Sequence, residues 1–153
     1  MKNKHVSSYE KGRLYKYLER QEQYRKVDIE ANPWYEPWSD CLKREADFEV
    51  EYHYTNTHYP IYIGMQSHFK YSKEDKDVWM IFPDFLDADG IVMMDRRVTP
   101  DLQGKAEMWI LNKNNIELHR SKISVGLTAY MTFYNNILAE LKVTKVNNYN
   151  MSR

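Results

Sequence analysis

Hydrophobic and polar residues alternate one by one just after residue 47. In residues 48–54, the apolar side chains of Phe48, Val50, Tyr52 and Tyr54 alternate with Glu49, Glu51 and His53. A period of two places successive side chains on opposite faces of a strand. We therefore predict a half-buried β-strand here, with its acidic residues on the solvent side.

Further short segments rich in β-branched or aromatic residues follow along the chain. They are residues 61–65, 69–71, 78–82, 91–94, 106–111, 123–129 and 137–143. Turn-forming residues separate them at residues 72–77, 87–90, 103–104, 112–115 and 135–136. Many short strands with little helix between them are typical of a closed or nearly closed barrel, which has no exposed edges. The predicted fold is mainly β, a small antiparallel β-barrel preceded by one N-terminal α-helix.

The N-terminal helix is predicted over residues 7–31. Ser7 and Glu10 have the spacing of a capping box, and Asn32-Pro33 stops the helix. The apolar stripe of Leu14, Tyr17, Leu18 and Tyr24 is interrupted by Gln21. The mixed charges on the other face favour a solvated surface over a membrane-lying or calmodulin-binding helix, which needs a basic face.

A segment rich in tryptophan and proline follows, in residues 32–44. Trp34 and Trp38 are interpreted either as hydrophobic plugs that pin the helix to a sheet or as hot spots for a binding partner. Since no Gly/Ser linker divides the chain, we expect a single domain. In it, residues 1–46 form the helix and a crossover packed on the barrel, and residues 47–153 form the barrel.

Composition excludes several classes of protein. The 22 basic and 22 acidic residues give a net charge of 0, and 42% of the chain is hydrophobic, which disfavours disorder and a basic nucleic-acid tail. No apolar run approaches the roughly 20 residues that a membrane helix needs, and the N-terminus lacks a secretory signal pattern. We expect a cytoplasmic protein without membrane contact. Its one cysteine, Cys41, allows no disulfide within the chain.

The sequence offers no recognisable catalytic or cofactor motif. Its five histidines lack the spacing of a zinc site, and its five glycines are too dispersed for a phosphate-binding loop. Placing Gly90 at the sixth position of a calcium loop puts Phe85 at the first and Arg96 at the twelfth, where carboxylates should lie. We expect no metal, no cofactor and no enzymatic activity.

The order of the strand signals in residues 48–146 resembles the C-terminal β-barrel domain of elongation factor Tu and related translational GTPases. The matching pieces are residues 58–61 (His-Tyr-Pro-Ile), 66–69 (Gln-Ser-His-Phe), 104–111, 126–127 and 137–143. The family's last hairpin carries an Arg-Glu-Gly-Gly-Arg run near aminoacyl-tRNA, whereas residues 132–136 here read Thr-Phe-Tyr-Asn-Asn. Because residues 1–46 are predicted to form a helix and a crossover, we expect no GTPase domain before the barrel. The resemblance therefore implies the barrel scaffold without the translation machinery, and a fold alone does not transfer a function.

The favoured function is that of a non-enzymatic protein-binding module. Its candidate binding residues are Trp34, Tyr35, Trp38, Tyr59 and Tyr62, since Trp and Tyr dominate interface energetics. The concrete form is a bacterial immunity protein that neutralises a cognate toxin. One alternative is an RNA-binding barrel, with Lys, Arg and Tyr interspersed in residues 13–25, although zero net charge disfavours it. A second is an enzyme with a pocket at the barrel mouth, built from His53, His58, Glu107 and tyrosines.

Overall fold

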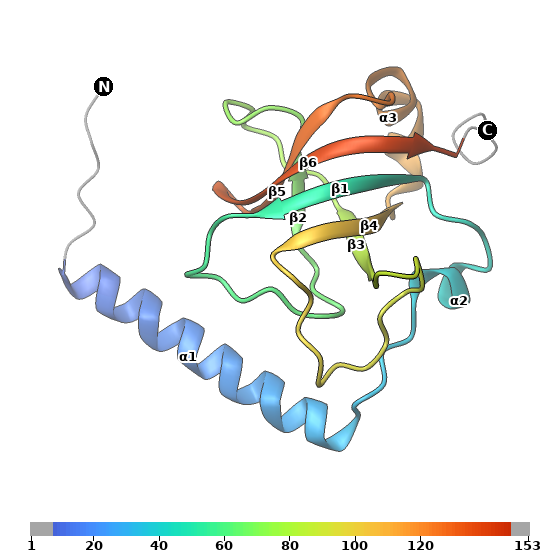
Figure 1. The fold of residues 1–153 in the computed structure, drawn as a ribbon. Helices are drawn as coiled ribbons and strands as arrows, with labels where there is room; N and C mark the ends of the chain where they lie inside the picture. The colour runs from blue at the N-terminus through green and yellow to red at the C-terminus, as the bar shows by residue number, and fades with distance from the viewer. Residues whose placement is uncertain (1–7, 148–153) are drawn as a thin grey trace. The chain divides into compact units, whose positions relative to one another are not determined.

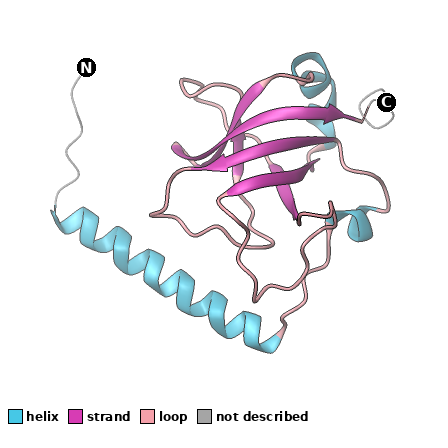
Figure 2. Ribbon diagram, viewed as in Figure 1, coloured by secondary structure: helices cyan, strands magenta, loops and turns pink. Residues whose placement is uncertain are grey.

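The computed structural model describes residues 8–147 and is mainly β (Figures 1 and 2). The elements are α1 (Ser8–Ala31), α2 (Trp38–Leu42), β1 (Phe48–Tyr54), β2 (His68–Lys70), β3 (Ile81–Leu86), β4 (Gln103–Ile110), the 3-10 helix η1 (Lys113–Asn115), α3 (Ile116–Lys122), β5 (Thr128–Phe133) and β6 (Asn136–Val146). The chain divides into two units between Pro33 and Trp34. The crossover is therefore part of the unit that contains the sheet.

The six strands form one antiparallel sheet that curls into a half-barrel (Figure 1). Their order is β2-β5-β6-β1-β4-β3. The two edges approach one another at a single bridge, where Phe69 of β2 and Trp79 exchange backbone hydrogen bonds of 3.0 and 2.9 Å. The prediction of a mainly β, antiparallel fold is confirmed. A closed barrel needs its two edge strands to pair along their length. Here the residues before β3 contact β2 through one isolated bridge, so the sheet remains a half-barrel.

Strand β1 matches its predicted pattern. Phe48, Val50, Tyr52 and Tyr54 are buried, while Glu51 is exposed. The strand lies between β4 and β6, and its inner side chains pack in the aromatic core. Phe48 meets Phe69 with ring centroids 5.9 Å apart, and Tyr52 meets Phe85 at 5.2 Å, both edge to face. Such pairs add roughly 0.5–1.5 kcal/mol to the hydrophobic effect.

Two predicted strands are wrong. Residues 61–65 form no strand, although Ile61, Ile63 and Met65 are buried. Pro60 cannot donate a backbone hydrogen bond, and Gly64 has a left-handed φ of 84°, so this segment fills the core as an irregular loop. In residues 91–94, pairing is limited to the bridge between Leu86 and Val92.

Other strands begin later than predicted, and two short helices were missed. The strands predicted over residues 78–82 and 123–129 are β3 (Ile81–Leu86) and β5 (Thr128–Phe133). Helix α2 lies in the crossover predicted to be irregular, and α3 occupies residues assigned to no element. The predicted turn over residues 112–115 leads into α3. Here the Asn112 side chain caps η1 by accepting the Asn114 N–H at 3.0 Å.

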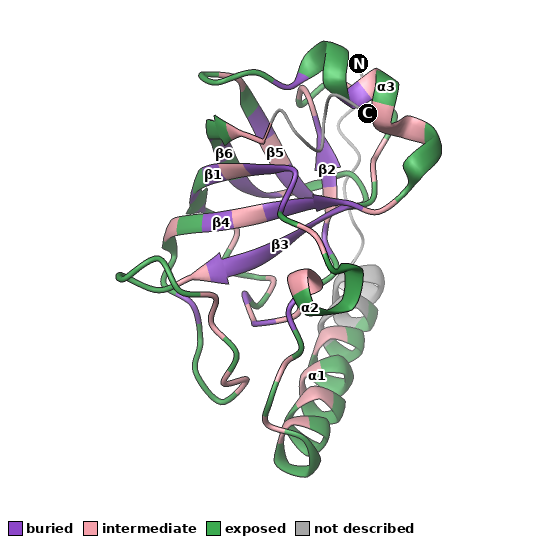
Figure 3. Cartoon of the chain, turned by 90° about the vertical axis from the view of Figure 1, so that its right-hand side faces the viewer, coloured by how far each residue is buried: buried purple, intermediate pink, exposed green. Residues whose placement is uncertain are grey.

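Helix α1 is present over the described part of the predicted range, and Ser7 of the proposed capping box lies outside the described residues. The residues of α1 whose burial is described are exposed or half-buried (Figure 3), with Tyr17 48% and Tyr24 71% exposed. The interrupted apolar stripe agrees with this exposure. Among the helices of residues 8–147, none combines the length and apolar character needed to cross a bilayer.

Candidate protein-binding surface

The crossover after Pro33 is attached to the outer face of β3. Ile81 and Phe85 belong to the core inside the sheet, so the intervening Phe82 and Asp84 face the other way. The ring of Trp38 packs 6.2 Å from Phe82, centroid to centroid, and the Trp38 backbone N–H donates to Asp84 at 3.0 Å. Trp38 therefore packs the crossover against the outer face of β3.

The buried Asp84 carboxylate also accepts a hydrogen bond from the Tyr35 hydroxyl at 2.5 Å. Burial raises the pKa of Asp84, and the bonds from Tyr35 and Trp38 oppose that rise. Burial, with the nearby Asp84 charge, raises the pKa of Tyr35 far above its ordinary value. The phenol thus stays protonated and remains a donor. Half-buried Tyr35 and Trp38 are held in place by this contact.

Trp34 has a different environment, because its side chain is 60% exposed. Its backbone forms an antiparallel bridge with Asp95, and the next amide, of Tyr35, donates to the Met94 carbonyl at 2.8 Å. The Arg97 guanidinium lies 5.5 Å from the centre of the Trp34 ring and is itself held by Asp95 at 2.8 Å. We call Trp34, Met94, Asp95 and Arg97 the Trp34 surface.

The other two candidate residues, Tyr59 and Tyr62, lie in the connection between β1 and β2. Both are half-buried and pack against the core. The centre of the Tyr59 ring lies 5.6 Å from that of Phe133. The backbone carbonyl of Tyr59 accepts a hydrogen bond from the Tyr54 hydroxyl at 3.1 Å. The structure thus brings Trp34, Tyr35 and Trp38 together on the crossover and places Tyr59 and Tyr62 on a separate loop.

Sequence reasoning missed Asp84, Met94 and Arg97. A lone aspartate among the apolar residues of β3 was a signal for Asp84, since a buried carboxylate needs hydrogen-bond donors. Met94 and Arg97 carried no such signal, because their role depends on a bridge between residues far apart in the sequence.

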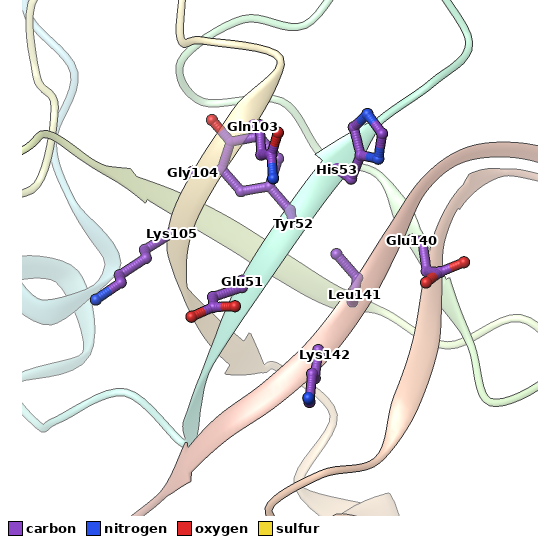
Figure 4. Close-up of a pocket in the computed structure, with 9 residues that line it drawn as sticks. All are labelled: Glu51, Tyr52, His53, Gln103, Gly104, Lys105, Glu140, Leu141 and Lys142. Carbon is purple, nitrogen blue, oxygen red and sulfur yellow. The ribbon is translucent and has the colours of Figure 1, made fainter.

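A hollow of about 440 Å³ lies on the outer face of β4, β1 and β6 (Figure 4). Glu51 lies between Lys105 and Lys142 in the strand register, and His53 lies between Gln103 and Glu140. Opposite charges on adjacent strands attract one another weakly at an exposed sheet face. The hollow is open to solvent, and its two glutamates, Glu51 and Glu140, are balanced by Lys105 and Lys142. These residues are typical of an exposed sheet face.

A smaller hollow of about 240 Å³ lies between the crossover and the start of β1. Glu49 and Glu107 face each other across the strands, and burial together with the Glu49 charge raises the pKa of Glu107. Lys145 lies 3.7 Å from Glu49, and the Arg44 guanidinium lies 5.2 Å from the centre of the Trp109 ring. The lining of this hollow thus combines the ion pair of Glu49 and Lys145 with the hydroxyl of Ser39.

Two residues proposed for an enzymatic pocket, His53 and Glu107, lie apart on the sheet. His53 pairs with Gln103, and Glu107 lies four residues farther along β4, or about 13 Å at the rise of a strand. His58 lies in the loop after β1, past the same end of the strand as His53. Within residues 8–147, no three His, Cys, Asp or Glu side chains gather to hold a metal ion.

Comparison of the chain with known protein families, curated proteins and solved structures gave no match.

Proposed function

We propose that this chain is a non-enzymatic protein-binding module whose Trp34 surface contacts the partner. The observation that carries the proposal is that Trp34 is 60% exposed yet held by its bridge to Asp95 and by the Arg97 side chain. Tryptophan and arginine are enriched among the residues that dominate binding free energy. Contact with the Arg97 guanidinium restricts the Trp34 ring, which reduces the conformational entropy that the ring loses when a partner covers it.

Exposed apolar side chains continue along the connection between β3 and β4. They are Ile91, Met94, Val98 and Leu102. Large apolar residues gathered in one exposed segment mark sites of association more often than scattered ones do. The bridge between Trp34 and Asp95 joins this segment to the crossover.

Quantitative affinity capture from the cells that make the protein tests the proposal. The bait is the full chain, compared with Trp34→Ala and with the control Val125→Ala, which truncates another side chain that is 67% exposed. We expect the wild type and Val125→Ala to capture the same protein in nearly equal amounts. Trp34→Ala should capture at least tenfold less of that protein. Equal recovery by all three baits contradicts the proposal, and recovery of RNA alone supports the RNA-binding alternative.

The concrete form of the proposal is a bacterial immunity protein, for which binding alone is sufficient. The captured partner is produced in a bacterial host with and without this chain. We expect it to arrest growth when produced alone, the wild-type chain to restore growth, and Trp34→Ala to fail. A partner that is harmless by itself rejects the immunity role and leaves protein binding intact.

We also infer that the unit after Pro33 is related in architecture to the C-terminal barrel of elongation factor Tu. The antiparallel curled sheet and the order of the motifs support this. Residues 58–61 lie between β1 and β2, residues 104–110 lie in β4, and residues 137–143 lie in β6. An experimental structure tests the relationship, because a common ancestor predicts the same strand order and a different order contradicts it.

A further inference from the structure

The turn between β5 and β6 contains a side chain in an unfavourable backbone conformation. Phe133 pairs with Asn136, so Tyr134 and Asn135 form the two-residue turn. Tyr134 has a φ of 52°, in the left-handed region where two-residue hairpins usually place Gly, Asn or Asp. Its side chain is 61% exposed. Contacts outside the turn must therefore hold this conformation.

The main such contact comes from a histidine on β2. The Tyr134 backbone N–H donates to Nδ1 of His68 at 3.1 Å, and the two rings lie 4.9 Å apart. An imidazole accepts at Nδ1 only when it is neutral and carries its proton on Nε2. The conformation of Tyr134 is thus coupled to the protonation state of His68.

The surroundings of His68 favour its neutral form. Lys70, on the same strand, donates from Nζ to the turn residue Asn135 at 3.2 Å and places a positive charge near the turn. Thr132 on β5, which is uncharged, pairs with His68. From the loop between β1 and β2, the nearby titratable group is Tyr59, which packs on Phe133. Among the described residues, no carboxylate forms a hydrogen bond or ion pair with His68, and burial lowers its pKa.

We propose that His68 is a pH-sensitive latch on the β5–β6 turn. Unprotonated Nδ1 holds Tyr134 in its left-handed conformation. Protonation turns Nδ1 into a donor that faces the Tyr134 N–H, so the hydrogen bond is lost and the turn relaxes. The exposed Tyr134 ring, which lies 4.9 Å from the ring of His68 at an angle of 50° and 4.9 Å from the ring of Phe133, then changes its position in acid. This inference is independent of the proposed protein-binding function.

NMR titration of the full chain between pH 4.5 and 8 tests the latch. The measured signals are the imidazole nitrogen shifts of His68 and the backbone amide shift of Tyr134. We expect the Nε2–H tautomer at neutral pH and a titration midpoint below 6.5 for His68. The Tyr134 amide shift should move with the same midpoint.

Two variants isolate the cause. In His68→Asn, the amide oxygen replaces Nδ1 as the acceptor and does not titrate, so the Tyr134 shift should become independent of pH. The control His53→Asn removes an exposed histidine on β1 and should leave the Tyr134 titration unchanged. A Tyr134 amide that stays constant while His68 titrates overturns the proposal, and so does an Nδ1–H tautomer at neutral pH. Both results come from the wild-type chain and do not depend on the variant folding.

Discussion

Asp84 is the residue through which the crossover is held on the sheet. Its buried carboxylate accepts the Tyr35 hydroxyl at 2.5 Å and the Trp38 amide at 3.0 Å, from two residues nearly fifty positions away. A buried carboxylate that loses a donor retains its desolvation cost. The attachment of the crossover, and with it the position of Trp34, should therefore respond to changes at Tyr35.

We predict that Tyr35→Phe lowers the free energy of unfolding by about 1–3 kcal/mol, because one donor to the buried Asp84 is removed. Urea denaturation followed by tryptophan fluorescence measures the change. Tyr24→Phe is the matched control, since Tyr24 is 71% exposed, and we expect it to change stability by less than about 0.5 kcal/mol. Equal stability of the two variants would argue against the role of the Asp84 contact.

We predict that Tyr134→Gly raises the free energy of unfolding by about 1 kcal/mol, because glycine adopts a positive φ without steric cost. The same denaturation experiment measures it. Gly126 already has a φ of 95°, and Gly126→Ala is the reciprocal control that should lower stability. If Tyr134→Gly is less stable than the wild type, the contacts of the Tyr134 ring stabilise the fold by more than the free energy that its left-handed backbone costs.

At the scale of single residues, the sequence pattern did not specify what each candidate side chain does. It singled out Trp34 and Trp38 and left two interpretations open for both. The structure makes Trp38 a plug on Phe82 and leaves Trp34 60% exposed. Both are tryptophans in the same short segment, so the sequence does not distinguish their roles. The difference comes from long-range contacts, of Trp38 with Asp84 and of Trp34 with Asp95.

Among the elements, α3 is fixed to the sheet by a buried histidine. His119 is 1% exposed, its Nδ1 shares a hydrogen bond of 2.5 Å with the Tyr71 hydroxyl, and its ring meets Trp79 edge to face at 5.1 Å. Burial, reinforced by the Lys122 charge, lowers the pKa of His119 to about 4. Folding therefore competes with protonation of this ring.

Because the folded protein disfavours protonation of His119, we predict that the free energy of unfolding falls in acid. Because the folded-state pKa lies below the ordinary 6.5, the unfolded chain binds the proton first, and stability falls as pH drops from 6.5 toward 4. His119 should contribute a loss on the order of 2 kcal/mol between pH 7 and 4.5. Urea midpoints measured across this range should fall less steeply in His119→Phe than in the wild type. His53→Asn is the control and should keep the wild-type slope, whereas parallel curves for all three proteins rule out this contribution.

Elements with strict periodicity were predictable, and those formed by tertiary contacts were not. Strand β1 alternates over its whole length and has its predicted bounds. Residues 61–65 are as apolar as a strand, but burial alone does not specify backbone pairing, and Gly64 breaks the extended conformation. Helices α2 and α3 span five and seven residues, too short for a helical period to be read from the sequence.

In the molecule as a whole, the core belongs to the unit that follows Pro33. The buried apolar residues of the described chain lie between Ala46 and Val143, whereas the large apolar side chains described on α1 include exposed Tyr17, Tyr24 and Val27. The general class of this unit was predictable from repeated two-residue periods. The extent of barrel closure could not be predicted from the sequence, because it depends on the isolated bridge between Phe69 and Trp79.

We predict that residues 34–153 fold without the N-terminal helix. The fragment should keep the amide NMR shifts of β1 and β4 and a urea midpoint close to that of the full chain, since none of the α1 residues whose burial is described belongs to the core. A fragment that yields only the narrow shift range of an unfolded chain contradicts this division.

We propose that the protein contacts its partner through Trp34, whose side chain is 60% exposed. Site-specific photocrosslinking in the native cells tests it most directly, with a photoreactive aromatic amino acid placed at position 34 or, as the control, at position 125, where Val125 is 67% exposed. We expect one discrete crosslinked protein from position 34 that position 125 does not give. The absence of any discrete crosslinked protein from position 34, or the same product from both positions, contradicts it.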